Sequence, residues 1–129
     1  MKTDFRVRQS LEYIENHLNE EISLDSLARQ ACLSKYHYHR LFRQAAGEPV
    51  SQYIRKKRLE HAAEELAQTN RPILEIALNC QYASQEAFSR AFQRTYTLTP
   101  GKYRQLFASV RSNVIRMSVH AHRGCSLAA

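Results

Sequence analysis

The side chains of this 129-residue chain most suited to chemistry lie in residues 34–43, which read Ser-Lys-Tyr-His-Tyr-His-Arg-Leu-Phe-Arg. In a helix, Tyr38, Leu41 and Phe42 share one face at the spacing of a core. The opposite face then carries three cations and two flat polar rings, without a carboxylate: Lys35, Tyr36, His39, Arg40 and Arg43. Solvated helix faces usually mix both signs of charge, so this face suits a polyanion, and the alternative is an ordinary basic surface helix.

A second copy of this pattern follows later in the chain. Leu24, Leu27 and Ala28 match Ile73, Ile76 and Ala77, and then Ser34, Tyr38, Arg40 and Phe42 match Ser84, Phe88, Arg90 and Phe92. Each copy is a short helix, a tight turn and a longer helix that a serine can cap. This is the sequence pattern of a helix-turn-helix, whose second helix enters the major groove of DNA.

The elements that position these helices are also predicted to be helical. Three glycines, three prolines and the lack of strand-like alternation before residue 110 indicate an all-α fold of about seven helices. We expect a tandem helix-turn-helix domain over residues 5–107, with a first helix over 5–19, subdomains at 5–48 and 70–107, and a linker helix at 49–68. At 1.5 Å per residue this linker spans about 30 Å, close to the separation of about 34–36 Å between successive major grooves. A monomer could therefore place both recognition helices on one face of a duplex.

The bulk composition agrees with a nucleic-acid partner. The net charge of +7 favours an anionic surface. Three widely spaced cysteines form no disulfide framework, which indicates a reducing, cytoplasmic compartment. Neither a signal peptide nor a run of about 20 apolar residues is present, so no membrane partner is expected. Without a nucleophile–base set or a glycine-rich phosphate loop, we predict no enzyme activity, cofactor or small-molecule ligand.

Several short motifs resemble the DNA-binding domain of AraC/XylS-type transcriptional regulators over residues 7–107. They are Leu24-x-x-Leu27-Ala28, Arg40-Leu41-Phe42, Gly47-x-Pro49, Arg58-Leu59, Ile76-Ala77, Ser89-Arg90-x-Phe92 and Thr99-Pro100-x-x-Tyr103-Arg104. The position of this unit near the N-terminus is most similar to the MarA, SoxS and Rob group of stress-response activators. The resemblance implies a bacterial transcriptional activator that contacts double-stranded DNA of the nucleoid and RNA polymerase.

Two departures from the family pattern affect the prediction. The family often has glycine in each turn between the two helices, and here those places hold Cys32 and Gln81, which implies a small strain in each turn. At the reading positions Tyr36, His39 and Glu86 stand where the related group has tryptophan, glutamine and glutamine. The fold is therefore expected to carry over, and the operator sequence is not.

The candidate DNA contacts divide into two sets. For base readout we predict Tyr36, His39, Arg40, Gln85, Glu86 and Arg90. Arg40 could fork onto guanine or contact a phosphate instead, and Glu86 could accept from cytosine or pair with Arg90 four residues on. For phosphate contacts we predict Ser34 and Ser84, through the amides of the helices they cap, and Lys35, Arg43, Arg94, Lys102 and Arg104.

Other groups have simpler interpretations. The basic run at residues 55–58 is expected to be a solvated face balanced by Glu60, Glu64 and Glu65. Cys32 and Cys80 are expected to be small buried fillers, with a thiol redox switch as the alternative.

The last stretch, residues 108–129, is expected to be a flexible basic tail. His120-x-His122-x-x-Cys125 could bind zinc or nickel, although an incidental match is the preferred interpretation and no metal site is predicted. The alternation over 114–122 could instead begin a β-containing effector domain. Two rival functions remain open: a helical protein-interaction module, and the DNA-binding fragment of a larger ligand-responsive regulator.

Overall fold

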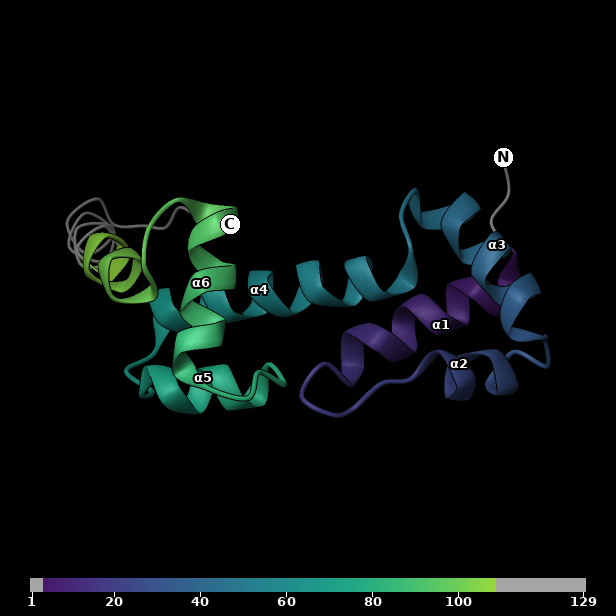
Figure 1. Ribbon diagram of the computed structural model, residues 1–129, viewed down its shortest axis with the longest axis horizontal. Helices are drawn as coiled ribbons and strands as arrows, with labels where there is room; N and C mark the ends of the chain where they lie inside the picture. Colours follow the sequence, from purple (N-terminus) through teal and green to yellow (C-terminus); the bar gives the residue numbers. More distant parts are fainter. Residues whose placement is uncertain (1–3, 109–129) are drawn as a thin grey trace, which may run out of the picture.

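The computed structural model describes residues 4–108, and it shows helices joined by short turns (Figure 1). In chain order the helices are α1 (Phe5–Asn16), α2 (Leu24–Gln30), α3 (Lys35–Ala46), α4 (Val50–Gln68), α5 (Ile73–Asn79) and α6 (Gln85–Tyr96). A further helical segment covers residues 100–108. Within residues 4–108 there is no strand, so the predicted all-α fold with about seven helices is confirmed.

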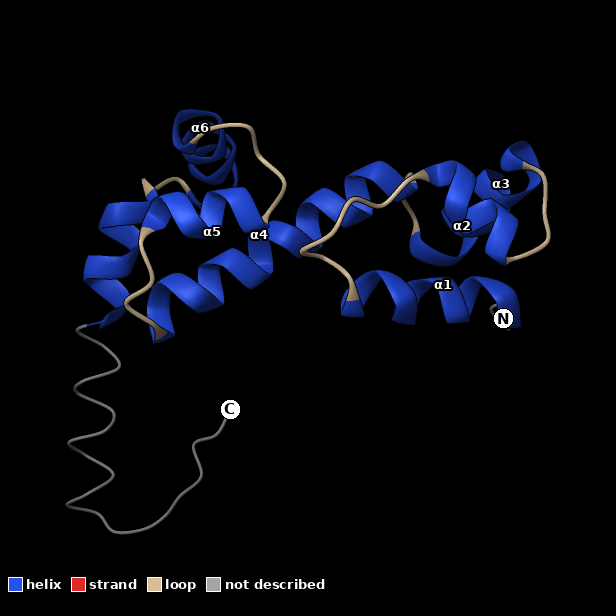
Figure 2. Ribbon diagram, turned by 90° about the horizontal axis from the view of Figure 1, so that it is seen from below, coloured by secondary structure: helices blue, strands red, loops and turns tan. Residues whose placement is uncertain are grey.

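Helix α4 joins two separate hydrophobic cores (Figures 1 and 2). We call α1–α3 the first unit, and α5, α6 and the segment 100–108 the second unit. The N-terminal half of α4 contributes Val50 and Ile54 to the core of the first unit, whereas its C-terminal half contributes Leu59, Ala63 and Leu66 to the core of the second. Each core is therefore completed by a different half of the same helix, and α4 connects the two units.

Side-chain caps explain where the helices of the two helix-turn-helix motifs begin. The hydroxyl oxygens of Ser23, Ser34 and Ser84 each accept a hydrogen bond of 3.1 Å from an amide in the first turn of α2, α3 and α6. These bonds satisfy amide groups that have no partner within the helix. At the other end, α3 stops at Gly47, whose φ of 82° is the left-handed conformation that glycine adopts at low cost.

The first helix is shorter than predicted, because α1 ends at Asn16 and the prediction continued to residue 19. The ring of His17 stacks on Tyr13 with centroids 3.9 Å apart, and its Nδ1 lies 2.7 Å from the Tyr13 carbonyl oxygen. That oxygen is the one that the His17 amide would use to continue the helix. The His17 amide donates to Ile14 instead, so the helix closes there.

The turns of the two helix-turn-helix motifs have the same backbone conformation. Cys32 has a φ of 59° and Gln81 a φ of 68°, both in the left-handed region that costs a non-glycine residue about 1–2 kcal/mol. Next to them the amide of Leu33 donates to the Ala28 carbonyl at 2.9 Å, and the amide of Tyr82 donates to the Ala77 carbonyl at 3.1 Å. The strain expected where the family often has glycine is therefore present in both turns.

Within residues 4–108, no helix has the length and apolar character needed to cross a membrane. Residues 109–129 lie outside the described residues. This applies to three expectations: the flexible tail, the alternative of a β segment, and the pattern of His120, His122 and Cys125.

Candidate nucleic-acid interface

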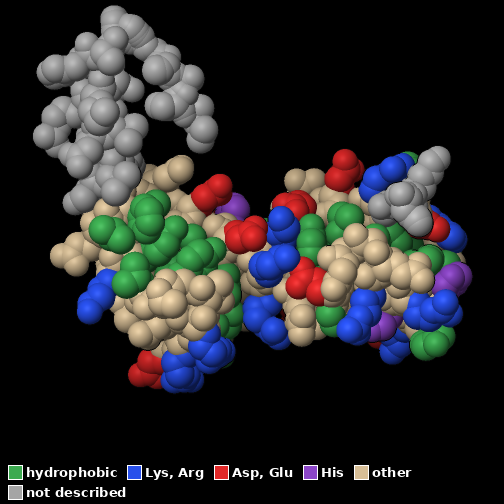
Figure 3. Space-filling view, turned by 90° about the horizontal axis from the view of Figure 1, so that it is seen from above, with side chains coloured by type: hydrophobic (Ala, Val, Ile, Leu, Met, Phe, Trp, Pro, Cys, Tyr) green, Lys and Arg blue, Asp and Glu red, His purple; other side chains and the backbone are tan. Residues whose placement is uncertain are grey.

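Helices α3 and α6 lie at opposite ends of α4, and each lies at the upper edge of its unit in the view of Figure 2. Figure 3 shows the molecule from the opposite side, so that this edge is at the bottom. Lys and Arg side chains gather along that lower edge over both units, with an acidic group among them at one end. The second helices of the two motifs therefore share one basic edge of the molecule.

The outer face of α3 carries an aromatic ring and a guanidinium group in contact. Tyr36 is 72% exposed, and the guanidinium carbon of Arg40 lies 5.8 Å from the centroid of its ring. Such a cation–π contact holds the arginine on the surface without burying it. His39 is partly exposed beside it, while Tyr38 and Phe42 on the inner face are fully buried. The structure thus separates the predicted base-contacting residues of α3 from its core residues.

Two predicted phosphate contacts of the first unit also lie at the surface. Arg43 is exposed in the last turn of α3. The Lys35 ammonium lies 3.1 Å from a carboxylate oxygen of Asp25, and both side chains are more than half exposed. Exposed ion pairs of this kind contribute about 0–1 kcal/mol, so Lys35 can exchange Asp25 for a phosphate at little cost.

The outer face of α6 brings together the three predicted base-contacting residues of the second unit. Gln85, Glu86 and Arg90 are exposed, and together with Ser84 and Ser89 they line a shallow hollow at the N-terminal half of α6. Among the described residues, no ion pair joins Glu86 to Arg90. The intrahelical pair that was the alternative for Glu86 is therefore not formed in this structure.

The predicted phosphate contacts at the C-terminal side of the second unit are of two kinds. Arg94 and Lys102 are exposed. Arg104 is not free: its Nε donates to the Leu66 carbonyl at 3.0 Å, and its Nη2 atom is buried without a hydrogen-bond partner. This arginine ties the segment 100–108 to α4. Its geometry does not support the phosphate contact expected from the sequence.

The basic run of α4 at residues 55–58 is only partly a solvated face. Lys57 does lie 3.5 Å from Glu60, but it also lies 3.5 Å from Glu15 of α1. Arg58 is half-buried and donates to the backbone carbonyls of Leu18 and Glu20, at 2.9 and 2.7 Å. The expectation of a solvated run is therefore wrong for Arg58, because this side chain reaches across to the loop after α1.

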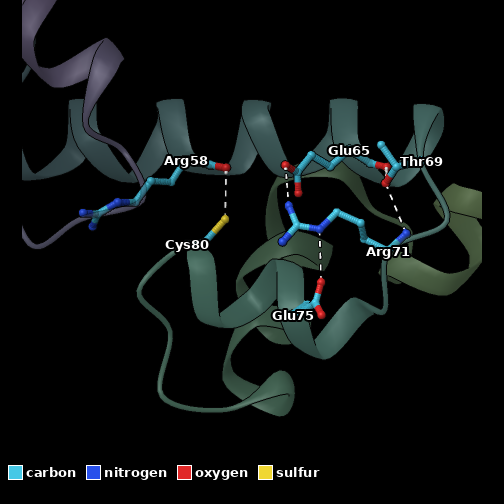
Figure 4. A network of polar contacts seen from close by, with 6 residues as sticks. All are labelled: Arg58, Glu65, Thr69, Arg71, Glu75 and Cys80. Carbon is cyan, nitrogen blue, oxygen red and sulfur yellow. Dashed lines mark hydrogen bonds and ion pairs between the residues drawn. The ribbon is translucent and has the colours of Figure 1, made fainter.

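Two other contacts of α4 face the second unit (Figure 4). Glu65, expected to balance the basic run, lies 3.2 Å from Arg71, which also bonds Glu75 of α5 at 3.1 Å. Cys80 donates from Sγ to the Arg58 carbonyl at 3.4 Å.

The two cysteines within residues 4–108 differ in exposure. Cys80 is buried as expected, and this burial raises the pKa of its thiol to about 11. A thiol that stays protonated is a poor nucleophile, which argues against a redox role for Cys80. Cys32 is exposed, so the prediction that it is a buried filler is wrong. Within residues 4–108, no cluster of His, Cys, Asp and Glu side chains could hold a metal ion.

Comparison with known proteins identifies the family. A family model described as a helix-turn-helix domain matches residues 27–106. The regulatory protein SoxS of Salmonella typhimurium is 38% identical over 98 residues, which cover 76% of this chain and 92% of SoxS. The chain belongs to the AraC-type family of helix-turn-helix transcriptional regulators.

Other AraC-type relatives are longer than the matched region. An uncharacterized HTH-type transcriptional regulator of Bacillus subtilis, YbfP, is 43% identical over 98 residues, or 76% of this chain and 33% of YbfP. The right origin-binding protein of Escherichia coli K12 is 41% identical over 99 residues, or 77% of this chain and 34% of that protein. The chain thus spans about a third of the length of these two relatives.

Solved structures support the same AraC-type fold. The C-terminal domain of AraT, a response regulator from Geobacillus stearothermophilus, has a TM-score of 0.75 and 32% identity, over 82% of this chain and 88% of that one. The DNA-binding domain of AdpA in complex with a target DNA has a TM-score of 0.78, over 84% of this chain and 98% of that one. At 24% identity, the second comparison concerns the fold alone.

Two residues of this AraC-type chain with a part in the architecture were not singled out as sites from the sequence. They are Arg58 and Gln81, whose side chains bind backbone carbonyls in the loop after α1. Their partners lie 38 to 62 positions away in the chain, beyond the range of any local pattern. The sequence held one signal for Gln81. It occupies a turn position where glycine would be less strained, and a residue kept there despite the strain can be expected to use its side chain in a contact.

Proposed function

We propose that this chain binds double-stranded DNA sequence-specifically as a transcriptional regulator, with α3 and α6 in successive major grooves of one duplex. The observation that carries this proposal is the pair of similarly built helices on one basic edge of the molecule. The 19 residues of α4 span about 28 Å, and α3 lies beyond its end. This separation is compatible with the distance of about 34–36 Å between successive major grooves, so a monomer suffices.

Each exposed side chain then has a defined task. Arg40, supported by Tyr36, is suited to a bidentate contact with guanine, and His39 to a purine acceptor. In the second unit Gln85 suits adenine, Glu86 suits the amino group of cytosine, and Arg90 suits guanine. The phosphate contacts we propose are Lys35, Arg43, Arg94 and Lys102, with the first-turn amides of the helices that Ser34 and Ser84 cap.

The finer biological role belongs to the same proposal. We infer an activator that acts on chromosomal DNA in the bacterial cytoplasm and contacts RNA polymerase. The names of the relatives support a regulatory role and DNA binding respectively, since SoxS is a regulatory protein and the Escherichia coli relative is an origin-binding protein. Transcription of a bound promoter by purified polymerase, with and without the chain, tests the activator role: a rise supports it and repression overturns it.

Selection of bound duplexes from a random pool, followed by titration against salt, tests the DNA-binding proposal. The four cations proposed to contact phosphates predict a slope of about −3.6 in a plot of log affinity against log salt concentration. Affinity for the selected duplex should therefore fall by about 150-fold between 50 and 200 mM salt. A shuffled duplex of the same length is the control for sequence preference. An affinity that does not change with salt overturns the proposal and favours the protein-interaction module.

A further inference from the structure

Three consecutive backbone carbonyls in the loop between α1 and α2 accept hydrogen bonds from side chains far away in the sequence. Arg58 of α4 donates from Nε to the Leu18 carbonyl at 2.9 Å and from Nη2 to the Glu20 carbonyl at 2.7 Å. Between them, Nε2 of Gln81 donates to the Asn19 carbonyl at 2.7 Å. We call these three bonds the carbonyl clasp.

The carbonyl clasp lies where the two units meet. Gln81 belongs to the turn between α5 and α6, and Asn19 to the first unit, so their bond joins the units without passing through α4. Among the hydrogen bonds and ion pairs of residues 4–108, no other links the two units directly. Beside it lies a partly open cavity of about 270 Å³, lined by residues that include Ile22, Arg58 and Tyr82. The contact between the units is therefore not a closely packed apolar interface.

The rest of the connection is the middle of a single helix. Ile54 of α4 is buried in the first core and Leu59 in the second, and the four residues between them enter neither cluster. Helices of proteins curve with radii of about 60–100 Å, so a helix of about 28 Å can turn through about 16–27°. A rotation of 20° moves the far end of a 12-residue helix such as α6 by about 6 Å, nearly two base-pair steps. A bend of this size in α4 would change the spacing between α3 and α6, so a second contact that resists bending would help to fix that spacing.

We propose that Gln81 and Arg58 are positioning residues that fix the separation and relative orientation of α3 and α6. Arg58 holds the loop against α4, and Gln81 attaches the second unit to that loop. The spacing between the two contacted grooves is then a specificity determinant of the protein, in addition to the bases that are read. This inference rests on the proposed DNA binding for its consequence, although the clasp itself can be tested without DNA.

Residual dipolar couplings of the free, full-length chain test the clasp directly. In the unaltered protein the couplings of both units should fit one alignment tensor. In the Gln81→Ala and Arg58→Gln proteins, the couplings within each unit should still fit the structure of that unit. The two units should, however, require alignment tensors that differ from each other. Cys32→Ala is the matched control, since Cys32 has the same left-handed conformation in the first turn and an exposed side chain. One shared tensor in the Gln81→Ala protein would overturn the proposal.

Binding to selected duplexes with altered spacing tests the consequence. One base pair is inserted between the two contacted grooves, which should weaken binding of the unaltered protein by about tenfold. Gln81→Ala should reduce this penalty to about threefold or less, because the second unit can follow the displaced groove. The Cys32→Ala control should keep the full penalty. An unchanged penalty in Gln81→Ala overturns the positioning role, whereas failure to select any duplex overturns the proposed function and leaves the coupling measurement valid.

Discussion

Comparison of the two cores shows one edge-to-face aromatic pair that is common to the first and second units. Phe42 of α3 is fully buried and meets Tyr53 edge-on, with centroids 5.4 Å apart and an angle of 76°. Phe92 of α6 is fully buried and meets Tyr103 in the same way, at 5.2 Å and 85°. Edge-to-face pairs of this kind add about 0.5–1.5 kcal/mol beyond the burial of the rings. One element of packing is therefore common to the two motifs, although Phe92 also stacks on Tyr96, with ring centroids 4.6 Å apart.

The outer faces of α3 and α6 differ. In the first unit Arg40 lies over the ring of Tyr36. In the second unit the exposed face combines Arg90 with a carboxylate, Glu86. A carboxylate close to the phosphates of DNA is repelled unless it accepts a hydrogen bond from a base. We therefore expect the first unit to supply most of the affinity, and the second unit to discriminate between sequences.

The largest predicted effects concern the buried phenylalanines. Phe42→Ala and Phe92→Ala should each lower the free energy of unfolding by about 3–5 kcal/mol, because each removes a fully buried ring. Since the rings lie in separate cores, amide hydrogen exchange should accelerate chiefly in the unit that carries the change. Equal acceleration in both units by either variant would show that the two cores unfold as one.

The next predicted effects concern the two exposed arginines. Arg40→Ala should weaken binding to the selected duplex by about 1–3 kcal/mol and relax the preference at one or two base pairs. Arg90→Ala should weaken binding by a smaller amount, because we expect the second unit to contribute less of the affinity for DNA. Titrations of both variants on the selected and shuffled duplexes measure the difference. A larger loss for Arg90→Ala would reverse the assignment of affinity to the first unit, and a uniform loss on all sequences would make Arg40 a phosphate contact.

The smallest predicted effects concern the left-handed turn residues. Cys32→Gly should raise the free energy of unfolding by about 0.5–1 kcal/mol, because relief of a backbone strain of about 1–2 kcal/mol is partly offset by the larger conformational entropy that glycine loses on folding. Gln81→Gly gains the same relief but loses the hydrogen bond to Asn19, worth about 0.5–1.5 kcal/mol, so its net change should be close to zero. Urea unfolding measures both, with Cys32→Ala as a control that keeps the strained backbone. Equal stabilisation by both glycines would mean that the Gln81 bond adds nothing to stability.

Features set by neighbouring residues were predictable from the sequence. The caps at Ser34 and Ser84, the end of α3 at Gly47 and the buried faces of α3 and α6 depend on residues within one or two turns, and the structure contains them all. The same local logic correctly placed Tyr36, Arg40, Gln85, Glu86 and Arg90 at the surface. Their contacts with DNA remain proposals.

Features set by residues far apart could not be predicted. The roles of Arg58 and Arg104 depend on carbonyls of Leu18, Glu20 and Leu66, and a long cationic side chain gives no local sign of which carbonyl it will meet.

The wrong prediction for Cys32 arose because the two cysteines occupy successive positions of their turns, not the same position. Cys80 corresponds to Ala31, and both are buried, whereas Cys32 corresponds to Gln81, and both are exposed with a positive φ. A shift of one residue in a tight turn decides whether a side chain points inward or outward.

The exposure of the proposed base-contacting residues also has a consequence for how the recognised sequence of this protein could change over time. Tyr36, Arg40, Glu86 and Arg90 are exposed and belong to neither core. Surface substitutions away from caps and cores usually alter stability by no more than about 0.5 kcal/mol. Under the proposed base contacts, mutations at these positions would alter the recognised sequence one base pair at a time while the protein stays folded. A new regulatory target can then arise through single substitutions, without compensating changes in the interior.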